Sequence, residues 1–487
     1  MLNPIKYLEF RAKMEPEKLA LRDLSRSSNY GQLFLLVRKI AKKLEVAGIK
    51  PGDLVLTRLP SILDWVFINA LFHEACVSCS GHPDDPIDPR LQVDWVISLV
   101  PLANFAEDKV LVVDRAWLQD VENGEPSSVI KTFASEDDLC RLIFTGGTTG
   151  GAKAVPYSLR LLAERLPTTN PSWSADRDEM ALMGLDSVVG FLTALKSSVL
   201  GKTFYCPPPD DVVKCANHFK ITSLIGSPIQ LASFVKRVEL SADGIPPVQE
   251  IRVAGGILPQ PLMNQLWRLF HAKIYNDYGS TEVGGVCFDL VEQNRRPDRA
   301  GWVLPRAEVQ IVDELDQAQP FGAEGIVRTK TSGMACEYFK NPEATAKCFK
   351  DGWFYPGDRG RLNKNGLLFL TGRQSEIINH GGVKIDPVTI DEHLLAYPGI
   401  EDAAAFGFMG KSGFEQVAIA LVAKEDFDIP ALHSGLVKKF GAPVCFVRVK
   451  QIPRNQMGKV MRGQLRGRLS AILAEHERRT GTQVPNV

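Results

Sequence analysis

A short segment rich in glycine and threonine, ending in a lysine, is the part of the sequence with the clearest chemical potential. It runs from Phe144 to Lys153 and includes the end of an apolar run of strand type at 142–144. Glycines let backbone N–H groups turn toward a bound anion, threonine hydroxyls donate further hydrogen bonds, and the lysine adds positive charge. The segment therefore predicts a cradle for a polyphosphate rather than a flexible surface turn. It differs from the Walker A loop, because no serine or threonine follows Lys153, and from the dinucleotide fingerprint, which lacks these hydroxyls and the lysine.

Three further polar motifs follow in the sequence. They are Tyr278-Gly279-Ser280-Thr281-Glu282, then Trp353–Asp358 followed by Gly372-Arg373, and finally Arg454–Arg462 with its Gly458-Lys459 pair. Taken singly, each has an ordinary explanation: a carboxylate at a helix start, an aspartate in a turn and a solvated lysine. Their joint occurrence favours a shared functional role.

Alternating strands and helices must position these motifs. From Gly52 to Gly285, apolar β-branched runs alternate with amphipathic stretches of helical length, which predicts parallel sheets covered by helices. The strands are expected at 54–57, 110–113, 142–144, 202–205 and 251–254, and the helices at 63–75, 188–200, 228–240 and 259–270. From Gly301 to Gly372, short runs with turn signals such as Asn363–Gly366 predict a small antiparallel unit.

The predicted fold class is therefore α/β. A large N-terminal domain, residues 1–373, holds the parallel and mixed sheets layered with helices and the small antiparallel β unit. A small α+β C-terminal domain, residues 374–487, is expected after the change in pattern near Arg373.

Composition excludes several classes of protein. The chain has 487 residues with 57 basic and 57 acidic side chains, so its net charge gives no support for binding nucleic acid or an anionic membrane. No apolar run approaches the ~18 residues that would span a bilayer, and no signal peptide is recognisable. Nine cysteines without disulfide-framework spacing predict reduced thiols and a cytoplasmic location.

In their order, the four motifs resemble those of the adenylate-forming superfamily, and most closely those of its acyl-CoA synthetases. The resemblance extends from about Leu19 to Arg468. It implies that ATP and Mg²⁺ activate a small-molecule carboxylic acid to acyl-AMP with release of pyrophosphate, and that a thiol then displaces AMP. It also implies that the C-terminal domain is mobile between these two steps.

The resemblance implies roles for individual residues. Phosphate binding is implied for Thr145, Gly146, Gly147, Thr148, Thr149, Gly150 and Lys153. Thr281 is implied to contact the α-phosphate and Glu282 to bind the metal. Asp358, with Arg373 nearby, is implied to bind the ribose. Lys459 is implied to form the catalytic bridge between the carboxylate and the α-phosphate. The remaining nucleotide-binding residues, mostly around adenine, are Gly255, Gly256, Ile257, Tyr278, Gly279 and Ser280.

Five residues depart from the family pattern, and these departures concern the reaction rate and the hinge between the domains. Gly146, Ala152, Ala154 and Pro356 replace residues usual in the family, but they keep the charges and most donors, so altered rates rather than lost chemistry are expected. Ser375 occupies the hinge position usually filled by Asp or Lys.

The thiol acceptor is expected to be CoA, with the phosphopantetheine of an acyl or peptidyl carrier protein as the alternative. Gly381–Ile385 resembles the segment beside the pantetheine tunnel of CoA ligases. Residues 438–479 carry eleven Lys or Arg against two Asp or Glu, which suits CoA phosphates, an acidic carrier or simply a solvated helix. A non-catalytic nucleotide- or acyl-binding protein is the alternative of another class, although binding alone would not need Lys459.

The acyl pocket is expected near Leu185–Phe191, with Asp186, Ser187, Gly190 and Val283 as candidate lining residues. Asp186 either pairs with the ammonium of an amino-acid substrate or caps the helix that starts near Val188, and the cap is favoured. Small uncharged neighbours then indicate an aryl or fatty acid.

One group of potential metal ligands is interpreted as structural. His73, Cys76, Cys79 and His82 have spacings that superficially suit zinc. They straddle the end of an expected helix and the next strand, where cysteines behave as small apolar residues of the core.

Overall fold

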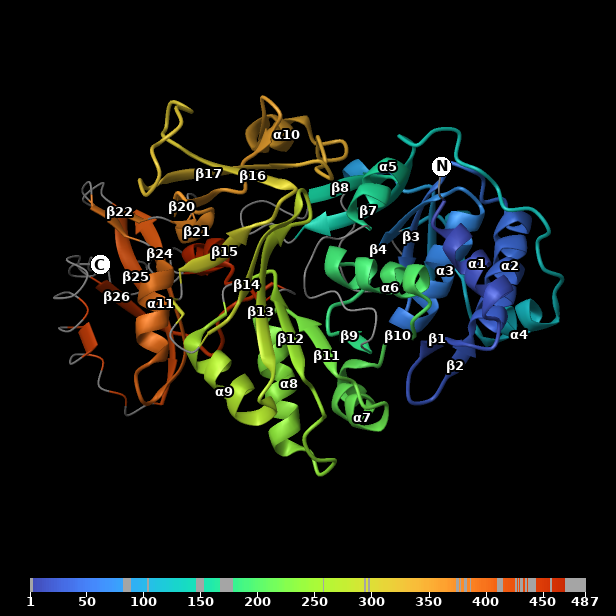
Figure 1. Ribbon diagram of the computed structural model, residues 1–487, viewed down its shortest axis with the longest axis horizontal. Helices are drawn as coiled ribbons and strands as arrows, with labels where there is room; N and C mark the ends of the chain where they lie inside the picture. The colour runs from blue at the N-terminus through green and yellow to red at the C-terminus, as the bar shows by residue number, and fades with distance from the viewer. Residues whose placement is uncertain are drawn as a thin grey trace, which may run out of the picture. The chain divides into compact units, whose positions relative to one another are not determined.

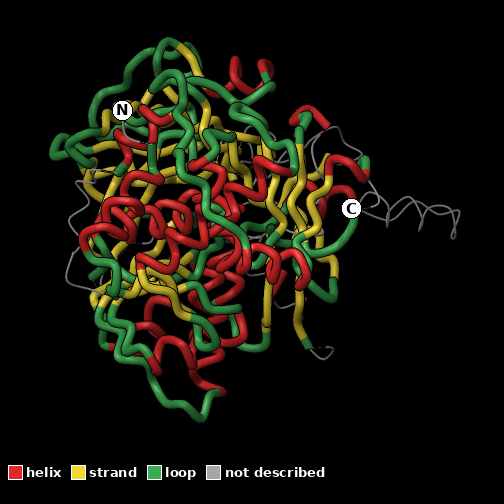
Figure 2. The backbone as a smooth tube through the Cα atoms, turned by 90° about the vertical axis from the view of Figure 1, so that its right-hand side faces the viewer, coloured by secondary structure: helices red, strands yellow, loops and turns green. Residues whose placement is uncertain are grey.

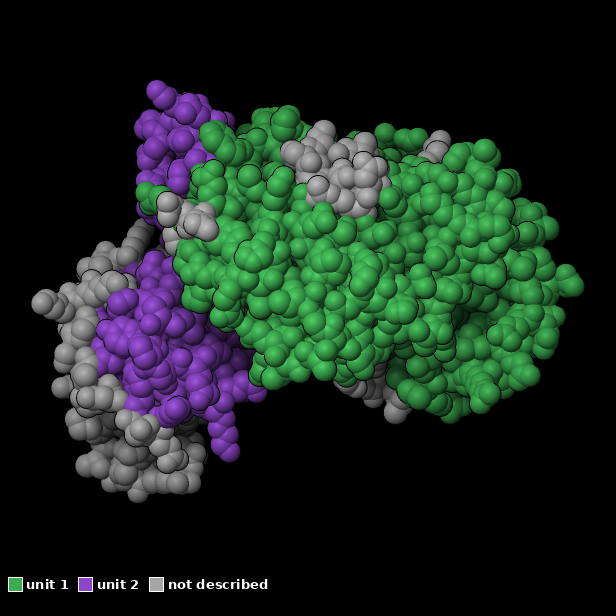
Figure 3. All heavy atoms as spheres, turned by 60° about the horizontal axis from the view of Figure 1, so that its bottom comes forward, with its two compact units in different colours: residues 1–145, 152–308, 329–354 green, residues 146–151, 309–328, 355–487 purple. Residues whose placement is uncertain are grey.

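The computed structural model describes residues 3–81, 89–102, 105–145, 153–166, 178–256, 258–292, 295–296, 298–373, 376, 378–380, 383–385, 387–409, 415–424, 427, 429, 432–433, 436, 444–455 and 458–468. The chain divides into two compact units (Figure 3). Unit 1 comprises residues 1–145, 152–308 and 329–354, and unit 2 comprises residues 146–151, 309–328 and 355–487.

The first sheet of unit 1 has the strand order β6-β5-β3-β4-β7-β8. Its strands are β3 (Leu54–Arg58), β4 (Val77–Ser80), β5 (Trp95–Ser98), β6 (Val110–Val112), β7 (Leu139–Thr145) and β8 (Lys153–Ser158). All neighbours are parallel except β7 and β8, which form an antiparallel pair. The glycine-rich segment thus connects β7 to β8.

A second sheet of unit 1 is parallel in its middle. Its strands are β1 (Leu19–Arg22), β2 (Ser27–Asn29), β9 (Glu179–Ala181), β10 (Phe204–Tyr205), β11 (Ser223–Gly226), β12 (Glu250–Ala254), β13 (Lys273–Ser280), β14 (Gly284–Leu290) and β15 (Arg299–Val303). The path β1-β10-β9-β11-β12-β13 is parallel, whereas β2, β14 and β15 pair antiparallel at its ends. The short strands β18 (Phe349–Lys350) and β19 (Trp353–Phe354) form a hairpin after residue 348. The parallel sheets expected between Gly52 and Gly285 are confirmed.

Helices cover both sheets of unit 1 (Figures 1 and 2). They are α1 (Ile5–Met14), α2 (Tyr30–Val46), α3 (Ser61–His73), α4 (Arg115–Asn123), α5 (Leu159–Arg165), α6 (Val188–Leu200), α7 (Val212–His218), α8 (Pro228–Leu240), α9 (Gln260–Phe270) and α10 (Pro342–Cys348). Three short 3₁₀ turns lie at Pro89–Leu91, Glu107–Lys109 and Pro209–Asp211. Apolar side chains of α7–α9 and β9–β14 form one core cluster, which packs these helices on the second sheet.

Helix ends follow local rules. The predicted helices 188–200 and 228–240 coincide with α6 and α8, and at the start of α8 the Ser227 N–H donates to the Gln230 side chain at 2.9 Å. The strand expected at 202–205 is shorter, because β10 begins only at Phe204. Gly201 ends α6 in the left-handed region (φ 65°), and the N–H of Lys202 donates to the Ser197 carbonyl. Lys202 therefore belongs to the end of the helix and not to the strand.

Unit 2 begins with the small antiparallel unit. It contains β16 (Ala307–Val312), β17 (Gly325–Thr331), β20 (Asp358–Leu362) and β21 (Leu367–Arg373), of which the first residues of β16 and the last of β17 belong to unit 1. β20 and β21 form a hairpin, in whose turn the Asn363 side chain accepts hydrogen bonds from the N–H groups of Asn365 and Leu367. This agrees with the expected turn.

The rest of unit 2 is α+β. Its elements are β22 (Ile378–His380), β23 (Val383–Ile385), α11 (Pro387–Leu395), β24 (Ile400–Met409), β25 (Glu415–Ala423), β26 (Val444–Arg448) and a helix at 462–468. β24 pairs antiparallel and β26 parallel with β25, and α11 packs on this sheet. The predicted α/β fold class is therefore confirmed. Within the described ranges of both units, no helix is long and apolar enough to cross a membrane.

Candidate active site

The ends of the glycine-rich segment lie on paired strands. Thr145, the last residue of β7, stands directly opposite Lys153, the first residue of β8. Residues 146–152 connect the two, so the predicted phosphate ligands Gly146, Gly147, Thr148, Thr149 and Gly150 lie outside the described residues. The antiparallel pair fixes both ends of the segment, and the Lys153 side chain therefore starts from a rigid position.

A buried cluster joins Lys153 to Glu282 through Tyr338. The Lys153 Nζ lies 4.7 Å from the centroid of the Tyr338 ring, and the Tyr338 hydroxyl donates to Glu282 Oε1 at 2.7 Å. Both Tyr338 and Glu282 are buried, with exposed fractions of 3% and 6%. Burial and the neighbouring Glu282 raise the pKa of Tyr338, so the phenol keeps its proton and remains the donor. The Sγ of Cys348 lies 3.8 Å from the same ammonium nitrogen.

A second buried residue, Arg165, holds the backbone at Thr281 and Glu282. Its guanidinium donates to the carbonyls of Thr281 (2.9 Å) and Glu282 (2.8 Å), and also to that of Gly333 (2.8 Å). The hydroxyl of Tyr157 donates to the Thr281 carbonyl at 2.7 Å and contacts the same guanidinium. Three carbonyls from two segments are thus gathered on one side chain at the end of α5.

The turn between β13 and β14 carries Thr281, Glu282 and Val283. It is tight, because a Cβ on Gly279 would lie 2.1 Å from the Gly284 carbonyl oxygen. Ser280 accepts from the Glu282 N–H at 3.3 Å, and Thr331 donates to the carbonyl of buried Val283. The turn therefore presents the Glu282 carboxylate from a fixed backbone, and a carboxylate oxygen is a ligand that Mg²⁺ prefers.

The residues predicted around adenine lie on neighbouring strands. Gly255 and Gly256 follow β12, and Tyr278 lies in β13, where Ala254 pairs with Asp277. Gly255 has a φ of 82°, a conformation that suits glycine, and both glycines and Tyr278 are half-buried. The structure brings these residues to one edge of the sheet. Ile257 lies outside the described residues.

The predicted helix cap at the acyl loop is corrected by one residue. Ser187, not Asp186, is the N-cap of α6: its hydroxyl accepts from the Gly190 N–H (3.0 Å) and donates to the Gly184 carbonyl (2.8 Å). Serine fits this role as well as aspartate does, and the helix begins at Val188, so the immediately preceding residue caps it. Gly190 packs on the loop, since a Cβ there would lie 2.1 Å from the Gly184 oxygen.

Asp186 instead belongs to a buried group of charges around Arg141. Arg141 is fully buried on β7 and donates to Ser78, Ser80 and the Leu185 carbonyl (2.6 Å). Electrostatic attraction to Asp64 and Asp186 supports its charge, although burial lowers the pKa of the Arg141 guanidinium. Arg141 thereby ties the strand before the glycine-rich segment to the acyl loop.

An open cavity of about 200 Å³ adjoins this loop within unit 1. It lies between the loop residues Gly184 and Leu185, the segment after β10 at Cys206, and the α8 side chains Gln230 and Arg237. It is not lined by the predicted residues Asp186, Ser187, Gly190 or Val283.

The ribose-binding candidates lie in unit 2. Asp358, the first residue of β20, is buried and stands opposite Arg373, the last residue of β21. Residues opposite each other in an antiparallel pair have Cβ atoms about 5 Å apart, so the expected proximity of these two positions is met in the backbone register.

Lys459 lies on a short loop of unit 2. The Asn455 side chain accepts from the Lys459 N–H, the Asn455 N–H donates to the Lys459 carbonyl, both at 2.9 Å, and Gly458 has a φ of 77°. Arg454 anchors the loop to Asp402 of β24 at 2.8 Å. The hinge candidate Ser375 lies outside the described residues, but its neighbour Glu376 pairs with buried Arg462 at 3.2 Å.

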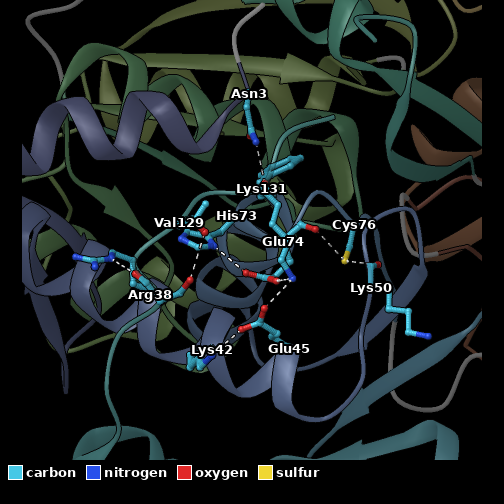
Figure 4. A network of polar contacts seen from close by, with 12 residues as sticks. Asn3, Arg38, Lys42, Glu45, Lys50, His73, Glu74, Cys76, Val129 and Lys131 are labelled. Carbon is cyan, nitrogen blue, oxygen red and sulfur yellow. Dashed lines mark hydrogen bonds and ion pairs between the residues drawn. The ribbon is translucent and has the colours of Figure 1, made fainter. Parts of the chain in front are cut away.

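Two of the potential zinc ligands, His73 and Cys76, lie in a polar network near the end of α3 (Figure 4). His73 Nδ1 lies 2.9 Å from Glu74 Oε1, and Lys131 lies 2.5 Å from the other oxygen of this carboxylate. Cys76 and Cys79 are buried, and burial raises the pKa of both thiols to about 12. Within the described part of the chain, which excludes His82, no group of three or more potential ligands is suitably placed for a metal ion.

Sequence reasoning missed Tyr338, Arg165 and Arg141. Of the three, Tyr338 is the residue that the sequence could have indicated. It lies between the second and third motifs, in a segment that also contains the turn-favouring residues Gly333 and Asn341. Arg165 and Arg141 bond mainly to backbone carbonyls and hydroxyls far away in the chain, so their own surroundings in the sequence give no sign of the partners.

Comparison with known proteins gives a consistent result. A family model described as AMP-binding enzyme matches residues 84–339. The 4-chlorobenzoate–CoA ligase of Arthrobacter sp is 24% identical over 98% of this chain and 97% of its own. The 2-succinylbenzoate–CoA ligase of Geobacillus kaustophilus (strain HTA426) is 25% identical over 94% and 97%. The structure of O-succinylbenzoate coenzyme A synthetase from Bacillus subtilis, in complex with ATP and magnesium ion, is similar with a TM-score of 0.80 at 22% identity, over 94% and 98% of the two chains.

Proposed function

Because the chain belongs to the family of AMP-binding enzymes, we propose that it is an AMP-forming ligase that joins an aryl carboxylic acid to CoA. In the first step a carboxylate oxygen attacks the α-phosphorus of ATP, so that an acyl adenylate forms and pyrophosphate leaves. In the second step the sulfur of CoA attacks the acyl carbon, and AMP leaves with the carboxylate oxygen it received. The family membership inferred from the four motifs is confirmed by the family model.

The observation that carries this proposal is the arrangement of Lys153 with buried Tyr338 and Glu282. An ammonium and a carboxylate lie within one small cluster, and the carboxylate stands on a turn whose backbone Arg165 holds in place. Opposite charges fixed in this way suit a polyphosphate and its counter-cation, since catalysis of phosphoryl chemistry rests on charges already in position.

In the proposed adenylation step, residues of unit 1 stabilise the charge that builds on the phosphates. Lys153 neutralises the departing pyrophosphate, and the Thr281 hydroxyl donates to the α-phosphate. The carbonyl of Thr281 already accepts from Arg165 and Tyr157, so the residue does not have to reorganise as the charge develops.

Glu282 is the proposed Mg²⁺ ligand. Its carboxylate has the hard oxygen that the ion prefers, its backbone is fixed, and one of its oxygens already accepts from Tyr338. When bound, Mg²⁺ withdraws negative charge from the phosphate oxygens and makes pyrophosphate a better leaving group.

Lys459 is proposed to bridge the acyl carboxylate and the α-phosphate, and Asp358 to bind the ribose hydroxyls. A domain boundary near residues 373–376, with Ser375 as hinge, is part of this proposal. It is supported by the Arg462–Glu376 pair, which ties the first residue after the hinge to the helix at 462–468. Glu376 would then move with Lys459 as part of one body.

An aryl acid and CoA are the proposed substrates. The relatives named above are ligases of 4-chlorobenzoate and 2-succinylbenzoate with CoA, and both acids are aromatic. An amino acid is less well supported, because Asp186, the candidate partner of its ammonium, is already attracted electrostatically to buried Arg141. A cytoplasmic location also belongs to the proposal and is supported by nine cysteines that are all free.

The test is pyrophosphate release from ATP and Mg²⁺ with a panel of aryl, fatty and amino acids, each with and without CoA. The proposal expects release with aryl acids, sustained turnover only with CoA, and the aryl-CoA thioester by mass spectrometry. Acyl-AMP without thioester would indicate a carrier-protein acceptor, and a response to amino acids alone would overturn the aryl assignment. If no acid of the panel causes pyrophosphate release although the nucleotide still binds, the non-catalytic alternative is indicated.

A further inference from the structure

We propose that Tyr338 is a positioning residue that separates Lys153 from Glu282 and so keeps each of them available, the ammonium for the polyphosphate and the carboxylate for Mg²⁺. This inference rests on the proposed function and assigns a task to a residue outside the four motifs. It follows from the way in which one aromatic side chain contacts both charged groups.

The ring and the hydroxyl of Tyr338 contact different groups. The Lys153 ammonium lies over the ring at 4.7 Å from its centroid, a cation–π contact, whereas the Glu282 carboxylate accepts from the hydroxyl at 2.7 Å. Among the residues that the structure describes, Lys153 forms no ion pair with a carboxylate. The aromatic ring therefore takes the place that a direct lysine–glutamate pair would otherwise fill.

Such a direct pair would work against nucleotide binding. Opposite charges a few ångström apart attract strongly in a poorly hydrated interior, and the pair would have to break before phosphate and metal could bind. A cation–π contact and a single hydrogen bond hold the two groups more weakly. Tyr338 thus positions both groups without pairing them with each other.

The packing around Tyr338 holds its ring in one orientation. Its backbone N–H donates to the Thr345 hydroxyl of α10 at 2.9 Å, and the ring of Phe349 meets it edge-on with centroids 5.3 Å apart. Phe349 in turn packs on Phe354 of β19 at 5.0 Å. The residue is 3% exposed, so the spacer cannot swing out into solvent.

Two substitutions separate the roles of the hydroxyl and the ring. Tyr338→Phe keeps the ring and removes the bond to Glu282, so the Mg²⁺ concentration needed for half-maximal nucleotide binding should rise about tenfold, as expected for a lost hydrogen bond to a charged group. Binding without Mg²⁺ should stay within about twofold, because Lys153 keeps its contact with the ring. Tyr338→Leu lets the lysine and glutamate pair, so nucleotide affinity should fall about tenfold or more both with and without the metal.

The readout is equilibrium binding of a fluorescent ATP analogue to the full-length protein across a Mg²⁺ titration, together with thermal unfolding. Phe349→Leu is the matched control, because it loosens the packing of the ring without removing a polar contact. It should lower the melting temperature and leave the Mg²⁺ dependence of binding within about twofold of the wild type.

Glu282→Gln distinguishes a failure of this inference from a failure of the proposed function. If Glu282→Gln weakens the Mg²⁺ dependence while Tyr338→Phe binds like the wild type, the spacer role is wrong and the metal assignment stands. A Phe349→Leu variant that copies Tyr338→Phe would likewise overturn the spacer role. If Glu282→Gln leaves the Mg²⁺ dependence unchanged, the metal assignment itself is wrong, and the spacer role falls with it.

Discussion

The turn that carries Glu282 and the loop that carries Lys459 are anchored in different ways. The first is held by side chains from other elements, above all buried Arg165, which donates to the Thr281 and Glu282 carbonyls. The second is closed by hydrogen bonds between Asn455 and Lys459, and the half-exposed pair between Arg454 and Asp402 joins its start to β24.

This difference suits two different tasks. A metal and phosphate site needs charges whose positions do not change during the reaction, because any reorganisation adds to the barrier. A lysine needed for one step only is better carried on a compact loop that travels with its own domain. We therefore infer that the Glu282 turn serves metal and phosphate binding throughout the reaction and that the Lys459 loop serves the adenylation step.

The largest effect on activity is expected from a substitution in the Lys459 loop. Lys459→Ala should lower carboxylate-dependent pyrophosphate release by about 10²-fold or more, because a cation at the reacting phosphate is lost. Nucleotide binding should change by no more than about twofold, because the residues proposed to bind the phosphates and the metal, such as Lys153 and Glu282, are unchanged.

Lys450→Ala is the matched control for this change. Lys450 is exposed and lies in the same basic region of unit 2. If both variants release pyrophosphate at the wild-type rate, Lys459 is not the catalytic lysine.

Arg165→Met, which changes the support of the Glu282 turn, should mainly lower the stability of the protein. It removes one donor from each of three carbonyls, of which those of Thr281 and Glu282 keep another, so the free energy of unfolding should fall by about 3 kcal/mol, which urea denaturation measures. Nucleotide binding in the presence of Mg²⁺ should weaken as well, because the Glu282 backbone loses its support. A stable variant with unchanged binding would show that the turn does not need this support.

The buried charges beneath the acyl loop predict a pH dependence. Burial raises the pKa of Asp64 to about 6, with Thr57, Ser80, Arg141 and Asp186 as the neighbouring groups that modify it. Between pH 4 and 6 the unfolded chain loses the Asp64 proton while the folded chain keeps it, so this group's contribution to stability falls as the pH rises.

Asp64→Asn removes that titration. Compared with the variant, the wild type should lose about 3 kcal/mol of unfolding free energy between pH 4 and 7, measured by urea denaturation at each pH. Parallel curves for the two proteins would mean that Asp64 titrates at its ordinary pKa.

The smallest expected effect concerns the cap of α6. Ser187→Ala should cost about 1 kcal/mol of stability, whereas Ser187→Asn, which keeps a capping side chain, should cost little. Thermal unfolding of both variants checks this order, and a Ser187→Ala variant as stable as the wild type would show that Ser187 is not the cap.

The sequence predicts those features that depend on local pattern. The bounds of α6 and α8 follow from periodicity and flanking residues, and the order of the four motifs was sufficient to recognise the family. The cap of α6 was misplaced by one residue, because serine and aspartate are nearly equivalent there and only the position of the helix start decides between them.

Long-range partnerships could not be predicted in the same way. Arg165 bonds to carbonyls 116 and 117 residues away, and Tyr338 bonds to Glu282, 56 residues away. A backbone carbonyl has no residue type, so its need for a donor leaves no trace in the sequence. These supporting residues become visible only when the fold brings the segments together.

The most direct test of the account follows an oxygen atom. The protein is incubated with ATP, Mg²⁺, CoA and 4-chlorobenzoate whose carboxylate carries heavy oxygen, and AMP and pyrophosphate are analysed by mass spectrometry. Attack of the carboxylate on the α-phosphorus predicts one heavy oxygen in AMP and none in pyrophosphate. 4-Chlorobenzoyl-CoA keeps the other heavy oxygen in its carbonyl, so its formation together with unlabelled AMP, or with heavy oxygen in pyrophosphate, would contradict the adenylate mechanism.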